Sequence, residues 1–210
     1  MIRVAFYSKE TEVRTMIPGL ASAAELRSAH YNLSPFEELP VLLNSRNDGL
    51  PELTMIPWGD KEGKAGREAV ILPEEAAELL KRKVVQPAAL LINGYFIWKK
   101  GRETEHPFFV RLLREPLLKV AAVLFRGNTP SASMIHTESN PLIYPISETM
   151  PLLLGEESDA PWRAGQLMPA ELVKHAALEY QLTDFSVLRV SKKVNDPSSN
   201  GEKLIQPIPK

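Results

Sequence analysis

An aromatic run in the middle of the chain constrains the fold more than any other feature. Residues 94–100 read Gly-Tyr-Phe-Ile-Trp-Lys-Lys, and residues 107–109 read Pro-Phe-Phe. Aromatic and β-branched side chains suit a pleated, half-buried surface, so both segments are predicted strands. The polar residues 101–105 supply the turn between them. The run therefore predicts a hairpin.

The composition favours many short strands joined by ordered turns. The chain has 210 residues, of which 18 are proline and 11 are glycine, whereas average proline usage is about 5%. Its length fits one domain, and the sequence contains no internal repeat, heptad pattern or linker. We expect an α+β fold in which residues 1–210 form a single domain.

Hydrophobic patterning predicts the remaining elements. Pro73 begins a helix well, since its missing N–H costs nothing in the first turn. The carboxylates of Glu74 and Glu75 complement the positive end of the same helix. Other helices are expected at 20–29 and 168–180, and a turn at Asn47-Asp48-Gly49. Strands are expected at 3–8, 39–44, 53–56, 88–98, 107–113, 117–126, 133–137 and 185–190.

Charge and cysteine content narrow the possible functions. The net charge of −1 provides no overall attraction to nucleic acid, so such binding requires a local basic patch. The absence of cysteine excludes disulfides, thiolate zinc ligands and a cysteine nucleophile. No apolar run approaches the roughly 20 residues that span a bilayer. The N-terminus also lacks the features of a signal peptide. We therefore expect a cytoplasmic protein without a membrane partner.

Several further motifs accompany the hairpin in a fixed order from Arg3 to Pro207. With it, they closely resemble the SRAP family, the SOS-response-associated peptidases known for capturing abasic sites in single-stranded DNA. The resemblance implies a SRAP-like domain of mostly antiparallel strands, with a barrel-like sheet core and a few short peripheral helices. The motifs are Tyr-Asn-Leu-Ser-Pro at 31–35, Trp-Gly at 58–59, Thr-Glu-Ser-Asn at 137–140, Ile-Ser-Glu-Thr-Met-Pro at 146–151, Val-Asn at 194–195 and Leu-Ile-Gln-Pro at 204–207.

The chemistry implied by the resemblance needs residues that this chain lacks. In the family, the amine and thiolate of an N-terminal cysteine attack the abasic aldehyde and close a thiazolidine. A glutamate and a histidine move the protons. Ile2, Ile97 and Ser147 stand at these three positions. We therefore expect a divergent member without active catalytic residues, which neither crosslinks abasic sites nor acts as a peptidase. No cofactor or metal is expected.

Two other groups offer alternative chemistry. A retained Met1 would carry an α-amine with a reference pKa of about 7.7–8.0, which can form a reversible imine with an aldehyde. Ser147 is a nucleophile only with a histidine and an acid to activate it, and the sequence supplies no such pair. A hydroxyl bonded within a turn is the simpler interpretation. The four histidines, at 30, 106, 136 and 175, have no metal-ligand spacing.

Nucleic-acid binding is the property that such a chain can retain. Single strands are held without sequence preference by cations on phosphates and aromatic rings on bases. The first hypothesis is a protein that binds single-stranded or damaged DNA in a DNA-damage or phage-related setting. The alternative is a non-enzymatic structural or protein-interaction paralogue whose groove has closed over with apolar side chains. The contacts implied by the resemblance are Arg3, Asn32, Trp58, Arg67, Lys99 and Thr137.

Overall fold

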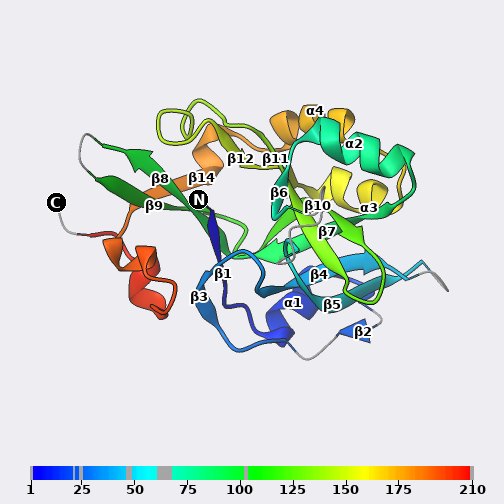
Figure 1. Ribbon diagram of the computed structural model, residues 1–210, viewed down its shortest axis with the longest axis horizontal. Coiled ribbons are helices and arrows are strands. Elements are labelled where there is room, and N and C mark those ends of the chain that lie inside the picture. Colours follow the sequence, from blue (N-terminus) through cyan, green and yellow to red (C-terminus); the bar gives the residue numbers. More distant parts are fainter. Residues whose placement is uncertain are drawn as a thin grey trace.

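The computed structural model describes residues 2–20, 22–23, 26–45, 49–60, 68–101 and 104–208. Within these ranges the strands lie in two sheets, and almost all neighbouring strands are antiparallel. Helices α2, α3 and α4 gather over the larger sheet, and the C-terminal segment lies beside the smaller one (Figure 1). The structure thus confirms the expected α+β class.

The smaller sheet contains the aromatic hairpin. Its strand order is β14 (Phe185–Arg189), β9 (Glu105–Leu112), β8 (Gly94–Lys100), β1 (Arg3–Phe6) and β3 (His30–Leu33). Strands β8 and β9 form the predicted hairpin, with Ile97 opposite Phe108 and Lys99 opposite His106. The hairpin is therefore central to this sheet, flanked by β1 and β14.

The larger sheet follows the order β12-β11-β10-β7-β4-β5-β2, with β13 paired to β10 and β6 paired to β11. A single parallel bridge between Trp58 and Ala132 brings the end of β5 to β11. Through this bridge the sheet is curved like a barrel, although among the described residues no ladder of strand pairs closes it. Its strands are β2 (Ser22–Ala23), β4 (Glu38–Asn44), β5 (Pro51–Pro57), β6 (Val70–Ile71), β7 (Val85–Ile92), β10 (Leu118–Phe125), β11 (Ser131–Glu138), β12 (Thr149–Pro151) and β13 (Leu153–Leu154).

Two of the three predicted helices are present in the structure, and the third is not. Helix α2 (Pro73–Lys81) begins at Pro73 as predicted, and α4 (Pro169–Glu179) matches the expected 168–180 helix. The helix expected at 20–29 is wrong, because Ser22–Ala23 pairs with β5 as a strand. Helix α1 (Glu10–Met16) comes earlier instead. No helix among the described residues is long and apolar enough to cross a membrane.

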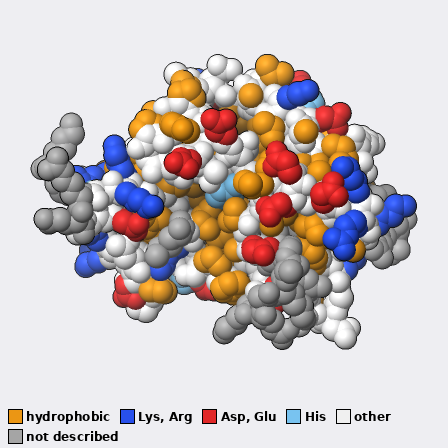
Figure 2. Space-filling view, turned by 45° about the horizontal axis from the view of Figure 1, so that its top comes forward, with side chains coloured by type: hydrophobic (Ala, Val, Ile, Leu, Met, Phe, Trp, Pro, Cys, Tyr) orange, Lys and Arg blue, Asp and Glu red, His pale blue; other side chains and the backbone are white. Residues whose placement is uncertain are grey.

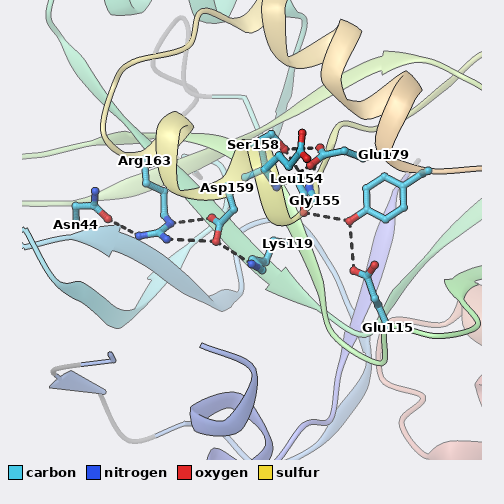
Figure 3. A network of polar contacts seen from close by, with 11 residues as sticks. Asn44, Glu115, Lys119, Leu154, Gly155, Ser158, Asp159, Arg163 and Glu179 are labelled. Carbon is cyan, nitrogen blue, oxygen red and sulfur yellow. Dashed lines mark hydrogen bonds and ion pairs between the residues drawn. The ribbon is translucent and has the colours of Figure 1, made fainter. Parts of the chain in front are cut away.

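Helix α3 (Glu156–Arg163), which no expected element covers, contains Pro161. Its Trp162 is fully buried and donates from Nε1 to the Ala88 carbonyl at 2.8 Å. The same helix carries Asp159, which accepts hydrogen bonds from Lys119 Nζ and Arg163 Nε, both at 2.8 Å (Figure 3). These contacts fasten α3 to β7 and β10.

The single strand expected at 88–98 is wrong, because the chain changes sheets at Asn93. The Asn93 side chain accepts from the backbone N–H of Tyr7 at 2.7 Å and of Ser8 at 3.1 Å, and it donates to the Pro116 carbonyl at 2.6 Å. The next residue must be small, since a Cβ on Gly94 would lie 2.4 Å from the Phe109 ring. Asn93-Gly94 is therefore the corner that joins β7 to β8.

The polar C-terminal segment contains short 3₁₀ helices. These are η2 (Lys192–Asn195) and η3 (Glu202–Ile205), and a third one, η1 (Leu182–Asp184), precedes β14. Val194 and Ile205 join Phe96 and Phe109 in a second apolar cluster on the outer face of the hairpin. Asn47 and Asp48 of the predicted turn lie outside the described residues.

Candidate nucleic-acid interface

Strand β8 presents its side chains alternately to two different apolar clusters. Tyr95 and Ile97 pack into the main core, whereas Phe96 and Trp98 face the C-terminal segment. Arg3 pairs with Phe96, so the same register places Ile2 opposite Ile97. Ile97 is 5% exposed, and Ile2 is half-buried against the main core. The two positions to which the resemblance assigns a cysteine and a glutamate are therefore neighbours in apolar surroundings.

Ser147 lies in the turn between β11 and β12. Its hydroxyl donates to the Thr149 carbonyl at 2.8 Å, as expected for a hydroxyl bonded within a turn. The turn faces the end of β8 across a cavity of about 500 Å³. This cavity is lined by Trp98, Lys99, Lys100 and residues 144–149.

His136 and Thr137 lie side by side on β11 in different environments. His136 is 6% exposed, its Nδ1 lies 3.4 Å from Thr149 Oγ1, and its Nε2 has no partner in the described structure. Burial lowers the pKa of His136 to about 3, so the imidazole is neutral at physiological pH. Thr137 instead lines a second, mainly apolar cavity of about 500 Å³ with Tyr180 and Phe185.

Arg3 and Asn32 are bound within the chain. Arg3 is 5% exposed and donates to Asn32 Oδ1 at 3.3 Å and to the Asn195 carbonyl at 3.1 Å. Asn32 Nδ2 contacts the carbonyl oxygens of Val194 at 3.2 Å, Asp196 at 2.9 Å and Ser199 at 3.1 Å. Both side chains thus hold the C-terminal segment, and their expected contacts with nucleic acid remain predictions.

The other predicted contact residues are placed differently. Trp58 is fully buried and donates from Nε1 to the Ser34 carbonyl at 2.8 Å, so its ring offers no face to a base in this conformation. Lys99 is exposed at the end of β8. Arg67 lies outside the described residues. In the described part of the chain, no three acidic or histidine side chains gather to hold a metal.

Three strands assemble a surface that sequence reasoning missed. Directly paired residues share one face of a sheet, so Lys99 lies beside His106, and Ile97 beside Phe108. Phe108 in turn pairs with Arg189 of β14, and Arg189 Nη2 lies 3.0 Å from His106 Nδ1. We call this surface, formed by Ile97, Lys99, His106, Phe108 and Arg189, the hairpin face. No local pattern signals it, since the pairing of β14 with β9 is long-range.

The molecule is visibly hollowed on one side. Figure 2 shows hydrophobic side chains lining a central hollow, with charged side chains of both signs around its border. The mixed border agrees with the net charge of −1. Any attraction for a polyanion is therefore local, as at the basic end of β8.

The sequence matches a known family over almost its whole length. The model of the SOS response associated peptidase (SRAP) family matches residues 2–197. The chain belongs to the SRAP family. This SRAP protein is 24% identical over 194 residues to the abasic site processing protein YoqW of Bacillus subtilis, covering 84% of this chain and 85% of YoqW. It is 26% identical over 189 residues to the abasic site processing protein YedK of Escherichia coli, covering 85% of this chain and 84% of YedK.

Solved structures share the SRAP protein's fold. A protein from Bacteroides thetaiotaomicron superposes with a TM-score of 0.80 at 17% identity, covering 98% of this chain and 99% of the other. A phage-related protein from Bordetella bronchiseptica superposes with a TM-score of 0.69 at 16% identity, covering 91% of this chain and 95% of the other. At such identities the likeness concerns the fold alone.

Proposed function

We propose that this SRAP protein binds single-stranded or abasic DNA non-covalently in the cytoplasm and does not crosslink it. The proposal rests on the arrangement of two apolar residues beside a cavity with basic residues at its border. The apolar pair Ile2 and Ile97 occupies the reactive positions, while the open cavity next to them is bordered by Lys99 and Lys100. The names of its relatives, abasic site processing proteins, support a DNA ligand.

Ile2 and Ile97, which stand at two of the reactive positions, cannot perform the proton transfers of the family's chemistry. Two isoleucines supply neither a nucleophile nor an acid, and the chain contains no thiol. His136 is buried with its pKa lowered to about 3, so it is no general acid near neutral pH. Even a Met1 imine would therefore remain reversible.

The basic end of β8 has the groups needed to hold a strand. Lys99 and Lys100 are exposed, and neither forms an ion pair within the described ranges. Tyr144, 53% exposed, lies on the opposite rim of the same cavity. Lysines on phosphates and an aromatic ring on a base are how proteins hold single strands without sequence preference.

A second candidate function is a structural or protein-interaction role without DNA binding. The burial of Trp58 and Arg3 favours it, because both positions were expected to contact DNA and instead stabilise the fold. This candidate predicts that a single strand is not retained at any salt concentration. The measurement of single-strand affinity described below separates it from DNA binding.

Incubation with an abasic single-stranded oligonucleotide is expected to give no denaturant-stable adduct. Ile2→Cys alone is expected to leave crosslinking inefficient, because Ile97 still supplies no proton-transfer group. A denaturing gel measures both, with an undamaged oligonucleotide as the control. Rapid adduct formation by the wild type would overturn the inactive assignment. Rapid formation by Ile2→Cys would show that a glutamate at position 97 is dispensable.

Neutralising Lys99 and Lys100 together by Gln is expected to weaken single-strand binding by roughly tenfold at low salt, since two phosphate contacts are lost. Fluorescence anisotropy with a labelled oligo-dT measures the affinity. Lys174→Gln, an exposed position on α4, is the matched control and should bind like the wild type. Equal affinity of the double variant and the control would exclude the basic end of β8 as the binding site.

A further inference from the structure

Basic side chains from three segments converge at the outer end of the hairpin face. Arg189, at the end of β14, reaches His106 on β9, with 3.0 Å between Nη2 and Nδ1. Lys192, in η2, donates from Nζ to Thr104 Oγ1 at 3.0 Å. Burial, with the positive charges of Arg189 and Lys192, lowers the pKa of His106. The two cations are thus close enough to act on the same imidazole.

The convergence has no counter-charge among the described residues. Lys99 lies opposite His106 on β8 and adds a third cation to the same face. Glu105 precedes His106, but it pairs with Lys100 and therefore points to the other face of the sheet. Neither Arg189, Lys192 nor Lys99 forms an ion pair within the described ranges. Since neighbouring like charges destabilise a sheet, an anion would complement this cluster.

The hydrogen bond between Arg189 and His106 also leaves N–H donors that an anion could accept from. Arginine only donates, so His106 accepts at Nδ1 and carries its proton on Nε2. The imidazole therefore offers an N–H donor besides the remaining N–H groups of Arg189 and the ammonium of Lys192. A guanidinium fork with additional donors matches the oxygens of a phosphate group.

We infer that Arg189, His106 and Lys192 bind a phosphodiester group of a single-stranded nucleic acid. The inference deepens the proposed function and rests on it. A polyanion fits better than a free phosphate, because the cluster continues along one surface into Lys99 and the half-buried ring of Phe108. The strand would thus run from the cavity at Lys99 toward η2.

The test compares the salt dependence of oligo-dT binding by the wild type and by Arg189→Gln/Lys192→Gln. Each phosphate contact on a single strand contributes about 0.7 to the slope of log K against log salt, so the double variant should lose about 1.4. Lys193→Gln, the exposed neighbour of Lys192, is the matched control and should keep the wild-type slope. Circular dichroism verifies that the variants remain folded.

An NMR titration of the His106 imidazole provides a second readout. A bound phosphate favours the imidazolium, so oligo-dT should raise the pKa of His106, and affinity should increase as the pH falls through that pKa. Arg189, Lys192 and Lys99 are the charged groups that face the imidazole. Inorganic phosphate at the same phosphate concentration should give a smaller rise.

The outcomes separate the two proposals. Unchanged slopes and an unchanged His106 pKa, while oligo-dT still binds, would overturn the phosphate site and leave the proposed function standing. Absence of strand binding by the wild type would overturn both. An equal response to inorganic phosphate and oligo-dT would overturn the assignment to a strand.

Discussion

Asp159→Ala is expected to destabilise the protein by about 3–5 kcal/mol, because removing one member of a buried ion cluster leaves the others uncompensated. Asp159 is 6% exposed and accepts from Lys119 and from two nitrogens of Arg163 (Figure 3). Burial by itself would raise the pKa of Asp159, but the hydrogen bonds and charges of Arg163 and Lys119 outweigh it, and the pKa is lowered.

Chemical denaturation of the variant and the wild type measures this loss. The free energy of unfolding of a native protein is only about 5–15 kcal/mol, so the expected loss is a large share of the stability. Glu78→Ala is the matched control, because it breaks the exposed ion pair with Lys81 in α2, where such pairs contribute about 1 kcal/mol or less. Equal effects of the two substitutions would show that the cluster around Asp159 is not what fastens α3.

Acidification is expected to destabilise the fold through His136. The native pKa is about 3, whereas the unfolded value is about 6.5. The contribution of His136 to stability is therefore complete above pH 6.5 and is lost as the pH falls toward 3, because only the unfolded state takes up the proton. The loss amounts to about 1.4 kcal/mol per pH unit, or about 2 kcal/mol at pH 5.

His136→Leu removes the titrating group from the same buried position. The variant should therefore show a shallower dependence of unfolding free energy on pH between 7 and 5 than the wild type does. Urea denaturation at a series of pH values measures both slopes. Parallel curves would mean that His136 takes up its proton equally in the folded and unfolded states, and Nε2, which has no partner among the described residues, would then need one.

Local sequence patterns correctly predicted those elements whose conformation depends mainly on neighbouring residues. The β8–β9 hairpin and the proline-started α2 follow from residue types that suit one backbone conformation. The patterns failed where a tertiary contact overrides them. Asn93 splits a continuous apolar run because its side chain is bonded to the backbone of residues 7 and 8.

The candidate site shows the same division. Sequence motifs identified Ile2 and Ile97, and the register of β1 on β8 makes them neighbours. The same motifs suggested DNA contacts at Arg3, Asn32 and Trp58, but a motif does not reveal which partner a side chain binds. The structure shows internal partners for all three.

By itself, the sequence determined the family, the α+β class and the absence of a thiol, because these depend on residue identity and order alone. Only the tertiary structure decided which cations share a surface. Arg189 meets His106 through the pairing of β14 with β9, two strands separated by more than 70 residues in the chain. Such pairing depends on the packing of the whole sheet, and no local pattern specifies it.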